Sequence, residues 1–421
     1  MALKIALLFC LLSPVIKAKE ILTYDIKSND NNLLLKSVTI DTSHLGHFVL
    51  NPSRAIPSTN TSEVKCHLSN QVSKIEFEKE TKCDSVSWDI SFKPLDINGI
   101  DISSQQNVYS SSGHWILFEW GDIHRIKGIV ESQVCINGKS CSPIPTMNQA
   151  PLIKAWGGKP ILISNHLFEA NIYADDILLD SKKNAINEKM SKLITYLRPI
   201  FNTQNGPVNW DLIFVNIDEK YRTVGGAAGY NSWVVNYVTN NGKFNEQRFE
   251  HTAHLVAHET IHTLTDIPLS FWVSESLTEY YTHKAFRLIE PTYESAIEEL
   301  IRKQVAQGDL SKRIGEVEPS NENLLFFYTK GAAFWQAIDE QLAKNNSSLD
   351  DLVDTLAHYE SDELLPESFI KKLVGIIGSF EAQKIIREYV QENSTQILVT
   401  HRWDGVCPQP LEHVMRQKNV E

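Results

Sequence analysis

Long apolar runs and an excess of basic residues are both missing from this chain of 421 residues. After residue 18 no segment approaches the roughly 18 consecutive apolar residues that a membrane-spanning helix needs. We therefore expect a soluble mature protein without a transmembrane segment. The 40 Lys and Arg are outnumbered by 52 Asp and Glu, which gives a net charge of −12. No basic cluster is interleaved with aromatic residues, which argues against a nucleic-acid partner.

Cysteines are few, six in all, and no C-x-x-C pair occurs, so a zinc site built from cysteines is not expected. Cys66 and Cys83 flank a predicted hairpin, and Cys135 and Cys141 flank an Asn-Gly turn signal. In an oxidising compartment both pairs could be disulfides, with free buried thiols as the alternative. Cys407 is left over.

The first 18 residues have the pattern of a cleavable secretory signal peptide. Lys4 gives a basic start, residues 5–12 form a short apolar core, and Ala18 precedes a plausible cleavage point at Lys19. The apolar core is too short to span a membrane. We therefore expect the protein to be secreted or periplasmic.

The most informative motif is H-E-x-x-H, formed by His258, Glu259 and His262 in a predicted helix over residues 252–264. Residues four apart share one face of a helix, so both imidazoles can reach a single metal ion. Glu259 lies one step round the helix, where it can act as general base on a metal-activated water without being a ligand. The alternative is a helix with two solvated or buried histidines.

A third ligand is available in Glu275, thirteen residues after His262. Residues 272–281 have apolar and aromatic side chains spaced as in a partly buried helix. Asp266 and Pro268 favour a turn between the two helices. Two antiparallel helices could then bring Glu275 to both histidines, which would complete the three protein ligands usual for a catalytic zinc.

Further polar residues lie close to this motif. Glu279 follows Glu275 by four residues and is predicted to hydrogen-bond a ligand histidine and fix its tautomer. The alternative is a solvated carboxylate on the helix surface. His254 stands one turn before His258 and could compete for the metal. We expect His254 instead to line the cleft or to lie on the surface, because no Glu follows it.

Together with the segment Y-T-K-G-A that begins at Tyr328, the two motif helices resemble the gluzincin metallopeptidases, above all the aminopeptidase N and glycyl aminopeptidase branches. The resemblance covers residues 223–335. It implies one zinc ion per chain, with Glu275 as its third ligand and Glu279 beside a ligand histidine. It also implies that the Tyr328 phenol stabilises the tetrahedral oxyanion. Otherwise Tyr328 is an aromatic residue of the core.

Three departures from the family pattern bear on specificity. The interval between His262 and Glu275 is shorter than in aminopeptidase N, and Ser276 stands where glycine is usual. The glycine-rich segment 225–232 has no glutamate to hold a substrate amino group. That segment is predicted to be an edge strand that aligns the substrate backbone by strand addition. The residues predicted to bind substrate are Gly225, Gly226, Ala227 and Ala228.

The chain is expected to have an α+β fold with three regions after the signal peptide. Residues 19–150 alternate polar and apolar side chains, which predicts an antiparallel β domain resembling a sandwich. Residues 151–290 hold a helix over 181–197, strands over 211–217 and 230–238, and the motif helices, which fits a thermolysin-like catalytic domain. Residues 291–421 are predicted to be mainly helical. The helices expected there span 292–307, 330–344, 349–358, 367–377 and 381–392.

These features predict a zinc metallopeptidase whose partner is a peptide or protein substrate. The alternatives are a catalytically inactive binding protein and a zinc hydrolase of a non-peptide substrate such as an epoxide. Removal of single N-terminal residues needs a carboxylate for the free amine, and Glu246, Glu250 or Glu279 could supply it. The small side chains of residues 225–229 leave room for a longer chain, which favours endopeptidase or broad action on small peptides.

Overall fold

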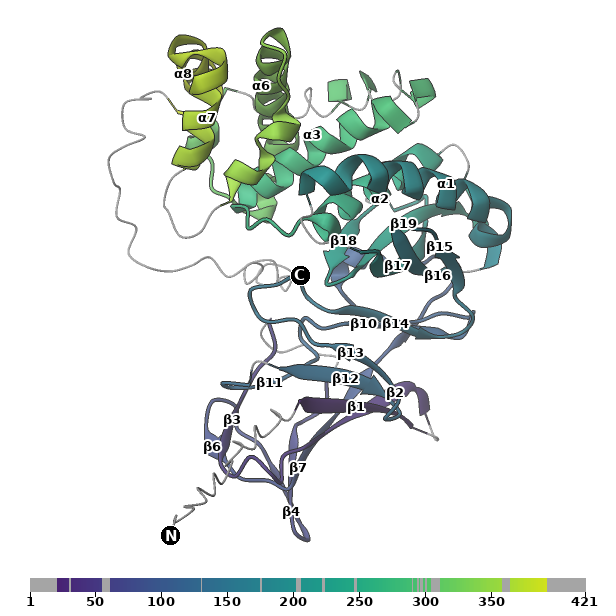
Figure 1. The fold of residues 1–421 in the computed structure, drawn as a ribbon. Helices are drawn as coiled ribbons and strands as arrows, with labels where there is room; N and C mark the ends of the chain where they lie inside the picture. The colour runs from purple at the N-terminus through teal and green to yellow at the C-terminus, as the bar shows by residue number, and fades with distance from the viewer. Residues whose placement is uncertain are drawn as a thin grey trace, which may run out of the picture.

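Strands form most of the first half of the chain and helices form most of the second half (Figure 1). The computed structural model describes residues 21–29, 32–54, 61–129, 131–174, 176–201, 206–221, 224–245, 248–289, 291–293, 295, 298–299, 301–303, 311–357 and 364–391. The predicted signal peptide, Glu246 and Cys407 lie outside these residues. The predicted α+β class is confirmed, with a sheet-rich N-terminal region and a helical C-terminal region.

The N-terminal region is built on a seven-stranded sheet with the order β13-β12-β1-β2-β7-β4-β5. Its pairings are antiparallel except for β1 with β12, which run parallel. The predicted alternation is seen in β7, where Val86, Trp88 and Ile90 are all buried. The strands span Leu22–Asn29 (β1), Asn32–Asp41 (β2), Lys65–Leu68 (β4), Gln71–Lys74 (β5), Ser85–Ser91 (β7), Ser132–Ile136 (β12) and Ser140–Pro143 (β13).

Two smaller sheets and two disulfides complete this region. The predicted pairs Cys66–Cys83 and Cys135–Cys141 are both disulfide-bonded, and the second closes the β12–β13 hairpin. The small sheets have the orders β11-β3-β6 and β14-β10-β9-β8. Their strands span Phe48–Asn51 (β3), Glu80–Thr81 (β6), Lys93–Pro94 (β8), Val108–Tyr109 (β9), His114–Phe118 (β10), Arg125–Ile126 (β11) and Ile153–Gly157 (β14).

A six-stranded mixed sheet carries the central part of the chain, with the order β15-β16-β17-β19-β18 and β20 paired to β19. The predicted strand over 230–238 begins later, at Ser232, because Asn231 adopts a positive φ of 54° in the turn that joins β18 to β19. Strand β18 is the last in the order and pairs with β19 alone among the described strands, as expected for an edge strand. The strands span Ile161–Ser164 (β15), Phe168–Tyr173 (β16), Val208–Asp218 (β17), Gly226–Gly229 (β18), Ser232–Asn240 (β19) and Lys243–Phe244 (β20).

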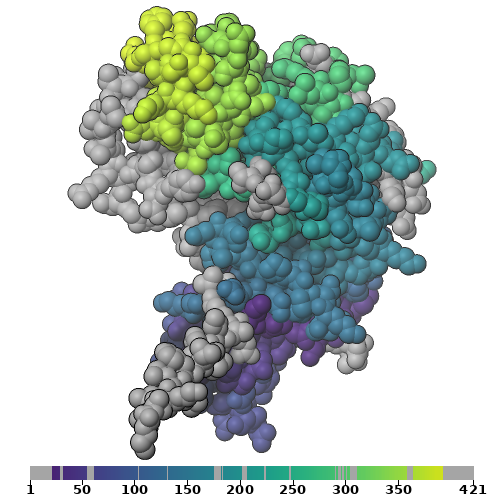
Figure 2. Space-filling model, viewed as in Figure 1, coloured from purple at the N-terminus to yellow at the C-terminus, as the bar shows by residue number. Residues whose placement is uncertain are grey.

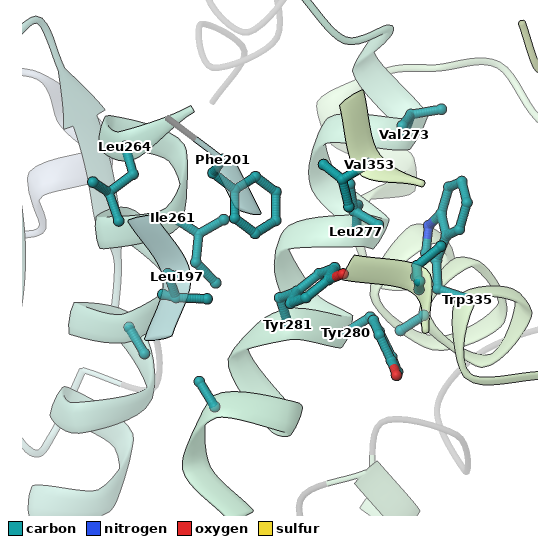
Figure 3. Packing of buried hydrophobic residues seen from close by; sticks show 14 of the residues in the cluster. Leu197, Phe201, Ile261, Leu264, Val273, Leu277, Tyr280, Tyr281, Trp335 and Val353 are labelled. Carbon is teal, nitrogen blue, oxygen red and sulfur yellow. The ribbon is translucent and has the colours of Figure 1, made fainter. Parts of the chain in front are cut away.

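The helices that cover one face of this sheet share one hydrophobic core with it, whereas the other face packs on β10 and β14. That core continues past residue 290, where the sequence suggested a boundary, because α3 packs on α6 through stacked Trp272 and Trp335 rings 5.7 Å apart. Figure 2 shows these C-terminal helices lying directly against the central part of the chain. Figure 3 shows buried side chains of α1, α2, α3 and α6 meeting in the core. The helices span Asp176–Phe201 (α1), Phe249–Leu264 (α2), Phe271–Ile289 (α3), Ala332–Lys344 (α6), Glu367–Ile377 (α7) and Ser379–Tyr389 (α8).

The single helix predicted over residues 349–358 is wrong. The chain forms two short 3-10 turns there, η7 (Leu349–Asp351) and η8 (Val353–Leu356). The Asp339 carboxylate accepts a hydrogen bond from the Leu349 backbone N–H at 2.7 Å, and the apolar side chains of this segment are buried in the core. These buried apolar side chains therefore anchor an irregular segment and do not form one face of a helix. The helix predicted over 292–307 falls partly outside the described residues. Across the described ranges, no helix is both long and apolar enough to cross a bilayer.

Candidate metal centre

Helices α2 and α3 face each other, and each carries a row of His or Glu side chains of the kinds that bind metal ions. His254, His258 and His262 follow one another at intervals of four along α2, so they share one face. Glu275, Glu279 and His283 do the same on α3. The two rows run in opposite directions, because His262 lies beside Glu275 whereas His254 lies beside Glu279 and His283. These six residues are called the α2/α3 cluster below.

The predicted ligand atoms converge at one end of the α2/α3 cluster. His258 Nε2 and His262 Nε2 are 3.2 Å apart, and Glu275 Oε2 lies 3.8 Å from the first and 3.6 Å from the second. A tetrahedral zinc with bonds of about 2.0–2.1 Å separates its ligand atoms by about 3.3 Å, so the three atoms fit one ion. This group, His258, His262 and Glu275, is called the first group.

The charge around His258 also suits a cation. Burial lowers the pKa of His258, but the Glu275 and Glu279 carboxylates outweigh that effect and raise the pKa to about 10. His262 and His258 hold the pKa of the partly buried Glu275 carboxyl below its usual range, although burial alone would raise it. The environment therefore stabilises positive charge at the first group, as a divalent ion would supply.

Glu279 touches the far side of His258. Its Oε2 lies 3.0 Å from His258 Nδ1. This contact orients the imidazole so that Nε2 faces His262 and Glu275. The carboxylate is fully buried, so the alternative of a solvated surface group does not fit the structure. Burial alone would raise the pKa of Glu279, but the neighbouring His254 and His283 hold it well below its usual range. Glu279 is therefore an anion enclosed by three imidazoles, and it cannot reach a substrate amine.

Glu259 points away from this row and lies against the edge strand. It is buried, and it accepts a hydrogen bond from the Ala228 backbone N–H of β18. A Cβ added to Gly226 would collide with the Glu259 carboxylate. Burial raises the pKa of Glu259. The glycine thus lets strand and carboxylate touch, and a raised pKa makes the carboxylate a better proton acceptor.

Tyr328 reaches the first group from the π-helical segment η6 (Phe327–Gly331). Its hydroxyl donates to Glu275 Oε2 at 3.1 Å, and its ring centroid lies 5.3 Å from that of His258. Burial raises the pKa of Tyr328 well above its usual value, so the hydroxyl keeps its proton. The neighbouring Phe326 and Phe327 are buried in the core, but the Tyr328 hydroxyl is directed at the ligands.

Ser276, one of the three departures from the family pattern, links α3 to α6 by a hydrogen bond and packs against η6. Its Oγ donates to the Trp272 carbonyl at 2.6 Å and accepts from Trp335 Nε1 at 2.8 Å. A Cβ added to Gly331 would collide with Ser276, so the two residues pack in direct contact. This close approach of η6 to α3 brings Tyr328 next to Glu275.

Three residues near the centre, His254, His283 and Asp101, were missed or only partly placed from the sequence. His254 was expected to line the cleft or to lie on the surface; it is partly buried, and its Nε2 lies 3.2 Å from Glu279 Oε1. His283 contacts the same oxygen at 3.2 Å, and its position four residues after Glu279 was the signal that could have revealed it. Asp101 was also missed. A Cβ added to Gly225 would lie 3.7 Å from the Asp101 carboxylate, so this acid stands beside the edge strand.

Comparison with known proteins supports the fold alone. No family model matches the sequence, and no curated protein matches it. The structure is similar to that of an aminopeptidase N family protein from Idiomarina loihiensis, with 12% sequence identity and a TM-score of 0.53, over 85% of this chain and 71% of that one. An M1 zinc metallopeptidase from Deinococcus radiodurans also matches, at 10% identity and a TM-score of 0.41, over 94% and 96% of the two chains. The predicted resemblance is thereby confirmed at the level of fold.

Proposed function

We propose that this chain is a zinc-dependent hydrolase of peptide bonds. The observation that carries the proposal is the convergence of His258, His262 and Glu275 on one point, with Glu259 and Tyr328 beside it. Two imidazoles and a carboxylate are a ligand set that catalytic zinc takes, with one position left open. The likeness of the fold to aminopeptidase N proteins supports the same conclusion.

Zinc bound to the first group would supply a water of lowered pKa and a Lewis acid for the scissile carbonyl. Glu259 would accept the proton of the attacking water and pass it to the leaving amine. The Tyr328 hydroxyl would donate a hydrogen bond to the oxyanion of the tetrahedral intermediate. Strand β18, which pairs on one side with β19, would align the substrate backbone along its other edge.

Replacing Tyr328 with phenylalanine is expected to lower turnover by about 10²- to 10³-fold with little change in KM. The oxyanion exists only in the transition state, so loss of its donor falls on the chemical step. Steady-state kinetics with one peptide measures both constants. Tyr389, which lies on α8, provides a matched phenylalanine control. An unchanged turnover in the Tyr328 variant would show that the Tyr328 hydroxyl takes no part in the chemistry.

The edge strand offers a second test. Gly226→Ala is expected to lower turnover by about 10-fold or more, because the added methyl displaces the general base Glu259. Gly375→Ala in α7 is the control, since a Cβ added there would meet nothing within 4 Å. The measurement is the turnover number of both variants beside their thermal unfolding. Equal turnover in the two variants would contradict the placement of Glu259 against β18.

The two alternatives from the sequence make different predictions. An inactive binding protein would leave a peptide pool uncut even when loaded with zinc, and a hydrolase of another substrate would convert an epoxide but no peptide. Incubating the zinc-loaded protein with a peptide pool and with model epoxides, before and after chelation, separates the three cases. The proposal predicts peptide products that disappear with the metal.

Removal of N-terminal residues is favoured over internal cleavage by one observation, the position of Asp101. This carboxylate lies beside Gly225, at the end of the strand that would hold the substrate. A free amine there would find the charge partner that β18 itself lacks. Endopeptidase action, which the small side chains of β18 favour, remains the competing proposal.

N-terminal acetylation decides between these two specificities. If Asp101 binds the substrate amine, acetylation abolishes cleavage, free peptides lose one residue at a time, and Asp101→Asn raises KM by about 10-fold or more. The control is Asp96→Asn, a change in the same region. Equal cleavage of free and acetylated peptides, at internal bonds, would assign the protein to the endopeptidases.

We also propose that the protein is secreted or periplasmic. Two disulfides support this, because such bonds persist in oxidising compartments. N-terminal sequencing of the exported protein is the test, and a start at Lys19 is expected.

A further inference from the structure

The α2/α3 cluster contains a second convergence of ligand atoms, at the end away from Glu275. His254 Nε2 and His283 Nε2 each lie 3.2 Å from Glu279 Oε1. The three ligand atoms are all within 4.8 Å of one another. This set, called the second group, repeats the composition of the first group: one carboxylate and two imidazoles held by the same pair of helices.

Hydrogen bonds account for only part of the second group, because His254 Nε2 is hydrogen-bonded to Glu279 Oε1 at 3.2 Å but, among the described residues, His283 Nε2 is not hydrogen-bonded. His283 is buried, yet its Nε2 makes no acceptable hydrogen bond within the described part of the chain, although it is 3.2 Å from the Glu279 carboxylate. The His254 and His283 rings lie 5.7 Å apart with their planes tilted by 40°. A buried ring nitrogen directed at a carboxylate without a usable hydrogen bond is the arrangement expected when both are ligands of one ion.

We propose that His254, His283 and Glu279 bind a second divalent transition-metal ion. Imidazole nitrogen and carboxylate oxygen are the donors that zinc accepts, and distances of 3.2 Å fit the edges of a tetrahedron around it. The side chain of His254 keeps 17% of its surface exposed, which leaves access for a water in the fourth position. The sequence-based expectation of one ion per chain then applies to the first group alone.

The second ion would act on the first group through Glu279. One oxygen of this carboxylate faces His254 and His283, and the other lies 3.0 Å from His258 Nδ1. An ion bound to the first oxygen fixes the plane of the carboxylate and therefore the direction of the contact with His258. It also joins α2 to α3 at a point the first group does not reach. The second site is thus structural, and it positions a ligand of the first.

Metal counting on the full chain tests the proposal. The protein is stripped with chelator, reloaded with zinc, freed of excess metal, and its bound zinc is counted by native mass spectrometry. We expect two equivalents in the unchanged protein. His283→Ala should retain one, and His262→Ala should also retain one, because each removes a ligand of a different group. His166→Ala, which changes an exposed histidine, is the control and should retain two.

One equivalent in the unchanged, zinc-saturated protein overturns the proposal, as does a second equivalent that survives in a folded His283→Ala protein. If His283→Ala does not fold, His254→Gln replaces it with the same expected loss. The result is separate from the proposed function. A protein that binds two ions but cuts no peptide refutes the peptidase proposal alone, and a peptidase with one ion refutes the second site alone.

Discussion

Replacing Glu259 with glutamine is expected to lower turnover of peptide hydrolysis by about 10³-fold or more while the protein keeps its zinc and its fold. An amide has nearly the shape of the carboxylate, so it fits the space that Gly226 leaves, and its oxygen can still accept from the Ala228 N–H. It cannot take a proton from water. The loss therefore falls on the chemical step and not on binding.

Kinetics and zinc content of the Glu259→Gln protein measure this effect. Glu388→Gln is the control, since Glu388 is an exposed residue of α8, and it should retain normal turnover. If the Glu259→Gln protein hydrolyses peptides at near the normal rate, Glu259 is not the general base. Loss of metal in that variant would instead show that Glu259 is a ligand.

Replacing His258 or Glu275 with alanine is expected to remove one equivalent of zinc and to reduce peptide hydrolysis to background. Each change takes away one of the three donor atoms that converge at 3.2–3.8 Å, and two remaining ligands hold zinc poorly. Without the ion the pKa of the attacking water is no longer lowered towards neutrality, which stops the reaction near neutral pH.

Elemental analysis and peptide hydrolysis measured on the same samples test this expectation, with the exposed His166→Ala as control. Thermal unfolding shows whether each variant is folded. Either variant retaining the full zinc content of the unchanged protein would show that the ligand set is wrong. Full activity with reduced zinc would show that peptide hydrolysis does not require the metal.

Local spacing explains why the convergence of the first group could be predicted. His258 and His262 are fixed by the period of a single helix, and Glu275 by a short connection to the next one. Tyr328 is distant in sequence and was predicted only through the family resemblance. Its place depends on contact between Ser276 and Gly331, which no local pattern reveals.

The parts that could not be predicted depend on tertiary contacts. Asp101 meets Gly225 only because the N-terminal region folds against the edge strand. The parallel pairing of β1 with β12 joins segments far apart in the chain, whereas alternation along a strand predicts only which side chains are buried. Residues 349–356 have apolar spacing like that of a helix, but anchoring to Asp339 and the core favours two separate turns.

The most direct measurement is digestion of a diverse peptide library in ¹⁸O-labelled water by the zinc-loaded protein and by Glu259→Gln. Mass spectrometry then identifies each product and its label. If the first group and Glu259 hydrolyse peptide bonds, the unchanged protein yields products whose new C-termini carry ¹⁸O, and Glu259→Gln yields almost none in the same time. An uncut library, or the same labelled products from both proteins, would contradict the account.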